Sequence, residues 1–346
     1  MIQRTACLLG KTYDPYRNQA IEQVLLQKIP QNTAFLFLWQ DQHSIVIGQN
    51  QNPWSECKVE DFIRSGGLIA KRQSGGSAVY HDLGRLNYTL IVPKSDFDIP
   101  RQLHVVSQAI SQFGISVIPS GRSALSLNGR IFSESTFFKA GNISYHHGTI
   151  PIDVNLNNVA HYLTPPNPET PNNADHAINL KQLNHSITIQ QMQIALFNSF
   201  YNIYGVLPTW IDETMLEKHT IEKIRSNFSK NSYIFPEIKP FTFSVSEHFL
   251  WGNVSIQFSC GDGIIRNPKL FSDAIETPLF PMIEQLLIGC PFLIGAIEKR
   301  FTQKRIEIGQ SDLTLILEDI CNLICGHIRS SDRDGHSFSI LSENKP

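Results

Sequence analysis

Charge, cysteine and long apolar runs are all scarce in this sequence, and each shortage excludes some kinds of protein. Among its 346 residues, 29 lysines and arginines nearly balance 31 aspartates and glutamates, for a formal net charge of -2. That balance gives no electrostatic reason to expect nucleic acid or an anionic membrane as a partner. No apolar run approaches the roughly 20 residues that cross a bilayer, and the apolar stretch after Met1 is too short for a signal peptide.

Common motifs of metal proteins and of several enzyme classes are missing as well. The six cysteines contain no CxxC pair, and Cys321 and Cys325, one helical turn apart in an apolar segment, indicate core packing rather than a metal site. Scattered cysteines are typical of a reduced, cytoplasmic protein. The absence of GxSxG, P-loop and GxGxxG motifs argues against the corresponding hydrolase, kinase and Rossmann classes.

Short apolar runs mixed with helical patterns predict an α+β protein. A helix begins after Asp14-Pro15, a buried hairpin covers 35–48, and an amphipathic helix covers 100–113. Thr188 begins a further helix with a capping box. The Pro- and Asn-rich loop at 164–174 is long enough to be a functional loop.

A change of pattern after residue 245 predicts a second domain. The strand over 251–258 and helices around 281–288 and 311–324 would form a small unit of their own. We therefore expect one domain over 1–245 and a smaller one over 246–346.

The most informative stretch of the sequence runs from Arg72 to Ile91. A basic pair precedes two adjacent glycines, Gly75 and Gly76, and two strand-like runs follow around a turn at 82–84. Adjacent glycines let a ligand approach the backbone N–H groups, and a nearby guanidinium offers forked donors for carboxylate or phosphate. The residues allow two interpretations equally, an anion-binding loop or a tight hairpin without a ligand.

For other polar residues, a structural or solvent-exposed role is an alternative to a functional one. Glu22 lies next to the apolar stripe of the first helix, where it reads most simply as a solvated carboxylate. His146 and His147 would point to opposite faces of a strand, so that one faces a pocket while the other packs or is solvated. Asp82 and Asp153 do not form a credible acid–base pair.

Taken together, these motifs resemble the lipoate–protein ligase A family, in that family's order and over nearly the whole chain. The matching segments are 18–22, 36–39, 46–48, 51–54, the stretch from Arg72 through Asn87, Gly121-Arg122, the His-His-Gly-Thr motif at 146–149, and 251–273. The stretch from Arg72 to Gly84 and the His-His-Gly-Thr motif are together quite specific.

The resemblance implies a biotin/lipoate-ligase-like α+β fold with a catalytic domain and a small accessory domain. It implies that lipoate and ATP give lipoyl-adenylate, with Mg²⁺ screening the phosphates. The lipoyl group would then pass to a lysine of a carrier. The carriers would be lipoyl domains of 2-oxoacid dehydrogenase E2 subunits and the glycine-cleavage H protein.

The resemblance also implies roles for particular residues. Arg72 would hold the acyl-phosphate end of the ligand, and Gly75 and Gly76 would allow close backbone approach. His147 and Thr149 would border the pocket. The remaining residues expected to bind substrate or ATP are Glu22, Ser77, Ala78, Val79, Tyr80 and His81.

The chain departs from the family pattern around the activation site. Arg130 is assigned to the position of the family's key lysine, where it keeps the charge but replaces a point charge with a forked group. Further departures are Gln49, Arg85 in place of an asparagine, Ser123-Ala124, Phe132, Glu134, and 177–183 at the place of the adenylate-binding loop.

These departures leave three hypotheses. The first is a lipoate–protein ligase that activates lipoate with ATP. The second is a catalytically degenerate paralogue that binds lipoyl domains. The third is a lipoyltransferase that uses preformed lipoyl-AMP.

Overall fold

The chain folds as two compact units, Met1–Pro236 and Glu237–Pro346, each with its own hydrophobic core. The computed structural model describes residues 2–121, 124–164, 178–235, 243–261, 263–274, 279–309 and 312–333. Helices and mixed sheets confirm the predicted α+β class. The domain boundary expected after residue 245 stays a prediction.

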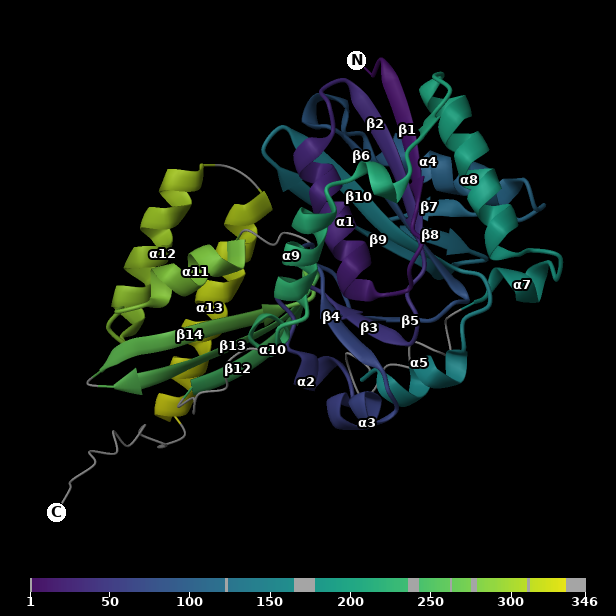
Figure 1. The fold of residues 1–346 in the computed structure, drawn as a ribbon. Coiled ribbons are helices and arrows are strands. Elements are labelled where there is room, and N and C mark those ends of the chain that lie inside the picture. The colour runs from purple at the N-terminus through teal and green to yellow at the C-terminus, as the bar shows by residue number, and fades with distance from the viewer. Residues whose placement is uncertain are drawn as a thin grey trace. The chain divides into compact units, whose positions relative to one another are not determined.

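The described part of the larger unit is built on an eight-stranded sheet in the order β11-β1-β2-β6-β10-β9-β8-β7 (Figure 1). β1 runs parallel to both of its neighbours, and the remaining pairs are antiparallel. The strands are β1 (Arg4–Leu9), β2 (Thr33–Trp39), β6 (Arg85–Pro93), β7 (Ile118–Ser120), β8 (Ala124–Leu127), β9 (Arg130–Ala140), β10 (Ile143–Pro151) and β11 (Thr209–Trp210).

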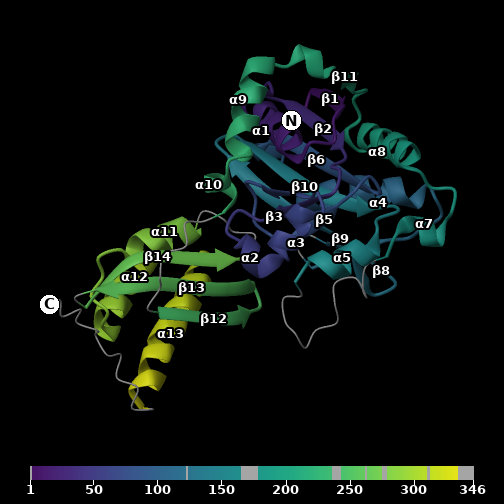
Figure 2. The same cartoon turned by 60° about the horizontal axis from the view of Figure 1, so that its bottom comes forward.

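Helices cover both faces of this sheet (Figures 1 and 2). On one face, α4 (Ile99–Ser111) and α8 (Ile189–Tyr204) form a core with alternate residues of β2, β6 and β10. On the other face, α1 (Pro15–Lys28) and α9 (Lys218–Phe228) pack against the residues in between. Because both faces are covered, β2 and β6 are buried along their whole length.

A three-stranded sheet in the order β4-β3-β5 lies beside the large sheet. β3 (Ser44–Ile47) is parallel to β4 (Leu68–Lys71) and antiparallel to β5 (Val79–His81). Its core includes residues of the short helices α3 (Val59–Arg64), α5 (Leu156–Tyr162) and α10 (Asn231–Ile234). The short elements α2 (Pro53–Glu56), η1 (Lys94–Asp96), α7 (Leu180–Leu183) and η2 (Glu213–Met215) complete the described part of this unit.

Two predicted hairpins are wrong in their pairing, although their strands exist. β2 and β3 belong to different sheets, and so do β5 and β6. The short polar segments 40–43 and 82–84 are therefore corners at which the chain passes between the two sheets. A polar turn between two apolar runs looks the same in sequence whether the strands pair or separate.

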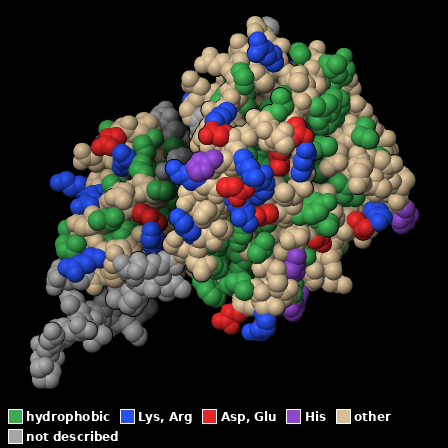
Figure 3. Space-filling view, viewed as in Figure 1, with side chains coloured by type: hydrophobic (Ala, Val, Ile, Leu, Met, Phe, Trp, Pro, Cys, Tyr) green, Lys and Arg blue, Asp and Glu red, His purple; other side chains and the backbone are tan. Residues whose placement is uncertain are grey.

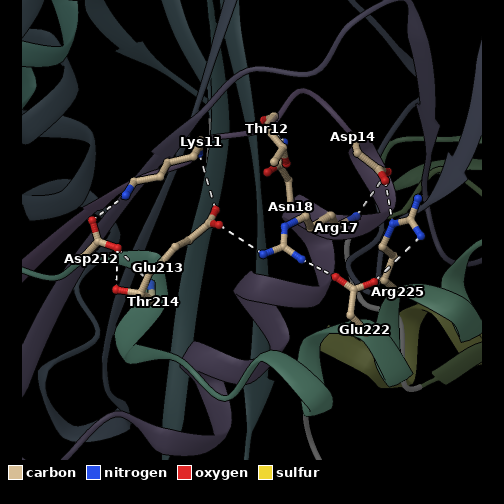
Figure 4. Close-up of polar contacts among 10 residues, drawn as sticks. All are labelled: Lys11, Thr12, Asp14, Arg17, Asn18, Asp212, Glu213, Thr214, Glu222 and Arg225. Atoms are coloured by element: carbon tan, nitrogen blue, oxygen red, sulfur yellow. Dashed lines mark hydrogen bonds and ion pairs between the residues drawn. The ribbon is translucent and has the colours of Figure 1, made fainter.

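Ion pairs tie α1 to the segment that contains η2 and α9 (Figure 4). Arg17 contacts Glu213 and Glu222, and Arg225 contacts Asp14 at 2.6 Å. Figure 3 shows side chains of both signs gathered over these two helices. The N-terminal helix is thus fixed by residues that lie about two hundred positions later in the chain.

The smaller unit places helices against an antiparallel sheet of β12 (Phe243–Phe249), β13 (Gly252–Gly261) and β14 (Ile264–Ser272). Its helices are α11 (Leu279–Leu287), α12 (Ile294–Ile308) and α13 (Asp312–Arg333). Cys321 and Cys325 lie in the core, as predicted. α12 was not predicted, because Ile297 and Phe301 are its only buried residues and give too thin an apolar stripe.

Some predicted features fall outside the described residues. The Pro- and Asn-rich loop is described only at Thr164, and Ser123 and Ala177 are not described. Within the described residues, no helix is long and apolar enough to cross a membrane.

Candidate active site

The Gly-Gly loop, residues 72–78, connects β4 to β5 and is folded around the Arg72 side chain. Nε and Nη2 of Arg72 donate to the carbonyl oxygen of Gly75 at 3.0 and 2.8 Å. Nη2 also donates to the Ser77 carbonyl at 2.8 Å, and Nη1 donates to that of Val46 at 3.0 Å. The guanidinium thus sets the shape of the loop, and its contact with an acyl phosphate stays a prediction.

Close packing holds the loop against both sheets. Gly76 has φ 91°, and a Cβ there would lie 2.6 Å from Cγ2 of Thr136 on β9. A Cβ on Gly48 would lie 2.3 Å from the carbonyl oxygen of Gly76. The Thr136 hydroxyl also donates to Ser74 Oγ at 2.7 Å. Because β4 and β5 both flank β3 and do not pair with each other, the tight-hairpin interpretation is wrong.

A group of buried polar side chains lies on the adjoining face of the large sheet. Arg85, Asn87 and Thr89 alternate along β6, with His147 opposite Thr89 and Thr149 opposite Asn87 on β10. Strand alternation places all five on one face, and none is more than 9% exposed. We call these five residues the polar floor.

Strand pairing joins the loop to the polar floor. Thr136, beneath Gly76, is the direct β9 neighbour of His147. Trp39 of β2 pairs with Asn87 and meets the His147 ring edge-on at 5.1 Å between centroids. The loop and the floor therefore belong to one site, bounded by an aromatic side chain.

Glu22 reaches this floor from α1. Its Oε1 accepts a hydrogen bond from the Thr89 hydroxyl and lies 3.0 Å from His147 Nδ1. A carboxylate only accepts hydrogen bonds, so this contact places a proton on Nδ1 of His147. Glu22 is 5% exposed, so its interpretation as a solvated carboxylate is wrong.

A second carboxylate–histidine pair lies where the chain passes between the sheets. Asp41 Oδ2 is 3.1 Å from His81 Nδ1, and Asp41 Oδ1 accepts from Asn18 Nδ2 at 2.8 Å. Asn87 Nδ2 is 3.2 Å from His81 Nδ1, which links this pair to the floor. Burial lowers the pKa of His81, and the hydrogen bond to Asp41 opposes that effect.

Sequence reasoning missed Asp41 because it lies in a polar turn, where aspartate is ordinary. The burial of Asn18 could have been predicted from its spacing. It precedes Glu22 by four residues, so the two polar side chains share a face of α1 with buried apolar residues.

The residues at the end of the loop separate onto two faces of β5. His81 lies with Asp41 and Asn87, whereas Tyr80 points into the core of the small sheet. The Tyr80 hydroxyl accepts from Asn158 Nδ2 at 2.8 Å. The structure therefore does not bring Tyr80 to the floor. Ser77 and Ala78 end the loop, and Val79 begins β5.

Arg130 lies apart from the other predicted site residues. It is exposed and pairs with Leu127, whose side chain belongs to the core beneath α4 and α8. The same register pairs Ile131 with Ser126, on the face that Thr136 shares with the floor. Ile131 thus occupies the site-facing position on this end of β9, and the structure does not bring Arg130 into the cluster.

Arg85, which the sequence marked only as a departure from the family pattern, brings a positive charge into the site. Its Nη1 donates to Thr149 Oγ1 at 2.9 Å. Burial lowers the pKa of its guanidinium to about 10. The floor therefore contains a desolvated cation beside two buried carboxylate–histidine pairs.

Two motif glycines have packing reasons. A Cβ on Gly148 would lie 2.2 Å from the Tyr88 hydroxyl, and one on Gly84 would lie 2.0 Å from the carbonyl oxygen of Asp153. These glycines let neighbouring segments meet closely, which accounts for their presence without any ligand.

Comparisons with known proteins agree with this arrangement. Residues 14–201 match the lipoyl protein ligase A/B catalytic domain, and residues 238–324 match the bacterial lipoate protein ligase C-terminus. The chain belongs to the lipoate–protein ligase A family, as its motifs predicted, and is an enzyme of the ligase class.

Two curated relatives match most of the chain. Lipoate-protein ligase A of Blochmanniella pennsylvanica is 30% identical over 300 residues, which cover 82% of this chain and 88% of that protein. Lipoate-protein ligase A of Psychrobacter cryohalolentis is 26% identical over 328 residues, or 91% and 96% of the two chains.

Solved structures confirm the fold. P. falciparum LipL1 in complex with lipoate gives a TM-score of 0.83 at 24% identity and covers 93% of this chain and 99% of its own. A bipartite ligase from Thermoplasma acidophilum, reported with its E2 lipoyl domain, gives 0.60 at 17% identity, covering 68% and 98%. A lipoate-protein ligase A bound with ATP gives 0.57 at 17% identity, covering 67% and 96%.

Proposed function

We propose that this protein activates lipoate with ATP and transfers the lipoyl group to a lysine of a lipoyl carrier domain. In the first step a carboxylate oxygen of lipoate attacks the α-phosphorus of ATP, and the bond to pyrophosphate breaks. In the second step the carrier amine attacks the acyl carbonyl, loses a proton and releases AMP. Both steps develop negative charge that fixed donors can stabilise.

The Gly-Gly loop packed beside the polar floor is the observation that carries this proposal. Arg72 holds the loop in place through backbone carbonyls, and glycine at 76 lets the loop pack directly on Thr136 of β9, beside the floor. The floor offers hydroxyl, imidazole and guanidinium groups in a desolvated setting, where hydrogen bonds to charged oxygens are strongest.

Mg²⁺ would enter this site with the nucleotide. The described residues hold no group of three or more His, Cys, Asp or Glu side chains suited to a metal. Mg²⁺ commonly keeps waters and binds through substrate phosphates, and it would screen the phosphate charge in the first step.

The carriers proposed are the lipoyl domains of 2-oxoacid dehydrogenase E2 subunits and the glycine-cleavage H protein. The T. acidophilum ligase reported with its E2 lipoyl domain supports the first of these. We also propose a cytoplasmic location, which the six thiols without any disulfide support.

The test incubates the purified full chain with lipoate, Mg-ATP and an E2 lipoyl domain, or with H protein in a parallel reaction. Mass spectrometry of the carrier and a pyrophosphate assay are the measurements. We expect a lipoyl mass increase that requires both lipoate and ATP. A folded chain that releases no pyrophosphate and leaves the carrier unmodified would contradict the proposal.

A transferase that uses preformed lipoyl-AMP is a second candidate, favoured by the shortage of cations in the site. No lysine is among the buried charged residues of the described chain, and Ile131 is apolar. This candidate predicts carrier modification with supplied lipoyl-AMP and none with lipoate plus ATP. Carrier binding without modification in either reaction would indicate a degenerate paralogue instead.

A further inference from the structure

Two arginines are buried in the described part of the chain, and their surroundings differ. Arg72 and Arg85 are 5% and 9% exposed. Arg72 donates four hydrogen bonds to carbonyl oxygens. Arg85 donates one, to the neutral hydroxyl of Thr149. Burying a guanidinium is costly unless its charge and its donors are matched.

No carboxylate whose side chain the structure describes forms an ion pair with Arg85. Asp82 is the nearby acidic group that affects it, but both Asp82 oxygens are already engaged. Oδ1 accepts from the Gly84 amide and Oδ2 from the Asn155 amide, each at 2.9 Å. Arg85 Nε is buried with no hydrogen-bond partner.

The free donors of Arg85 lie on one edge of its guanidinium. With Nη1 bound to Thr149, Nε and Nη2 make no hydrogen bond to a described residue. N–H groups on Nε and Nη2 are parallel, and they match the two oxygens of a carboxylate or phosphate. This edge therefore has the geometry to receive an anion with two acceptor oxygens.

The strand register puts this edge in the candidate active site. Arg85 shares its face of β6 with Asn87 and Thr89, and its partner Thr149 lies on the face that His147 occupies. β9 supplies no cation here, because Ile131 takes the site-facing position and Arg130 lies on the other face. Arg85 is thus the one cationic member of the polar floor.

We infer that Arg85 binds the anionic oxygens of the activation step, the carboxylate of the acyl substrate or the phosphate that becomes joined to it. This inference rests on the proposed function. It means that Arg85 on β6 supplies the positive charge of the site, which β9 does not provide. Thr149 positions the guanidinium by holding Nη1. Nε of this edge is screened from solvent, so an anion gains strongly by reaching it.

The test measures binding of three probes by calorimetry: lipoate, its neutral amide lipoamide, and Mg-ATP. Arg85→Gln is compared with wild type and with Arg64→Gln, which removes an exposed arginine of the same unit. We expect Arg85→Gln to weaken lipoate or Mg-ATP binding by about 10- to 100-fold. Lipoamide binding by Arg85→Gln should change less than about twofold, and Arg64→Gln should bind all three probes like wild type.

Arg85→Lys keeps the charge without the forked edge and serves if Arg85→Gln does not fold, as judged by circular dichroism and thermal melting. It should lose part of the affinity for the affected anion and none for lipoamide. Loss confined to lipoate identifies the carboxylate as the ligand, and loss confined to Mg-ATP identifies the phosphate.

The outcomes separate this inference from the proposed function. If wild type binds both anions and a folded Arg85 variant binds them equally well, the Arg85 assignment is wrong and the function stands. Equal losses for lipoate and lipoamide would show a structural role and would also overturn the assignment. If wild type binds neither lipoate nor Mg-ATP, both proposals fail.

Discussion

The α1 helix meets charged partners on two sides, and the two sides are built differently. Toward the sheet, Asn18 and Glu22 reach buried partners through hydrogen bonds that exclude water. Toward α9 and η2, Asp14 and Arg17 form ion pairs that are partly exposed. The difference shows that the stability provided by a polar contact depends on which groups stay buried and unpaired when the contact is broken.

Removing the Glu22 carboxylate should have the largest effect. Glu22→Ala leaves the Thr89 hydroxyl and the His147 ring buried without their acceptor. We expect a loss of about 3 kcal/mol in the free energy of unfolding, together with loss of lipoylation. Denaturant titration followed by tryptophan fluorescence measures the stability.

Glu22→Gln is the matched control, because its amide oxygen can still accept a hydrogen bond. It should lose much less stability than Glu22→Ala. If both variants unfold at the wild-type denaturant concentration, Glu22 does not organise the buried side of α1.

Lowering the pH should reduce the free energy of unfolding mainly through the buried histidines, and much less through the exposed ion pairs. His146 is fully buried against the rings of Tyr88 and Phe137, and burial lowers its pKa to about 3. The unfolded chain takes up a proton below about pH 6.5 that the folded chain excludes. Stability therefore falls with pH from about 6.5 downward, at a rate approaching 1.4 kcal/mol per pH unit.

His146→Phe should flatten this pH dependence, because phenylalanine fills a similar space and does not titrate. The pKa of His81 is also lowered, so part of the slope should persist. Denaturant titrations at several pH values between about 4 and 7 make the measurement. An unchanged slope in the variant would show that His146 is not kept neutral by burial.

Gly76→Ala should damage activity more than stability. The new Cβ would lie 2.6 Å from Thr136 Cγ2 at a backbone φ of 91°, so the loop must move off β9. We expect about 1–2 kcal/mol of destabilisation and at least about tenfold slower lipoylation.

Gly66→Ala is the control for strain alone. Gly66 also has a positive φ, 84°, but an added Cβ there would meet nothing within 4 Å. If Gly66→Ala and Gly76→Ala lose the same activity, packing on Thr136 does not position the Gly-Gly loop.

Breaking the ion pairs on the α9 side should have the smallest effect. Arg17→Ala removes the contacts with Glu213 and Glu222, for a loss of about 1 kcal/mol at low salt. The loss should shrink as salt is raised, because partly exposed pairs are screened. Lys28→Ala removes a more exposed contact, with Glu217, and should leave the melting temperature unchanged. A larger loss for Lys28→Ala than for Arg17→Ala would reverse the comparison.

Elements with strong periodicity were predictable from the sequence. The amphipathic helix at 100–113 became α4, and Thr188 caps α8 with the predicted box. Such segments carry their own burial pattern, so that distant contacts add little information. α12 lacked this pattern and was missed.

The site was predictable in its motifs and not in its contacts. The residues themselves pointed to Gly75 and Gly76, and the family pattern added His147. Asp41 and the burial of Glu22 depend on two sheets meeting at a corner. Arg130 was assigned from its position in a motif, whereas its strand register turns it away from the floor. The register of a strand depends on its pairing with a neighbouring strand. A shift of one residue moves every side chain to the opposite face of the sheet.

The position of β1 has a consequence for how the chain is made. This strand precedes the other described elements in the chain, yet it pairs with β11. Thr5 Oγ1 donates to the carbonyl oxygen of Val206 at 2.7 Å, 201 residues away. A chain that stops before Thr209 leaves β1 as an unpaired strand edge, which is prone to associate with other chains. Nascent chains shorter than this should therefore depend on chaperones, and release from them should follow synthesis of β11.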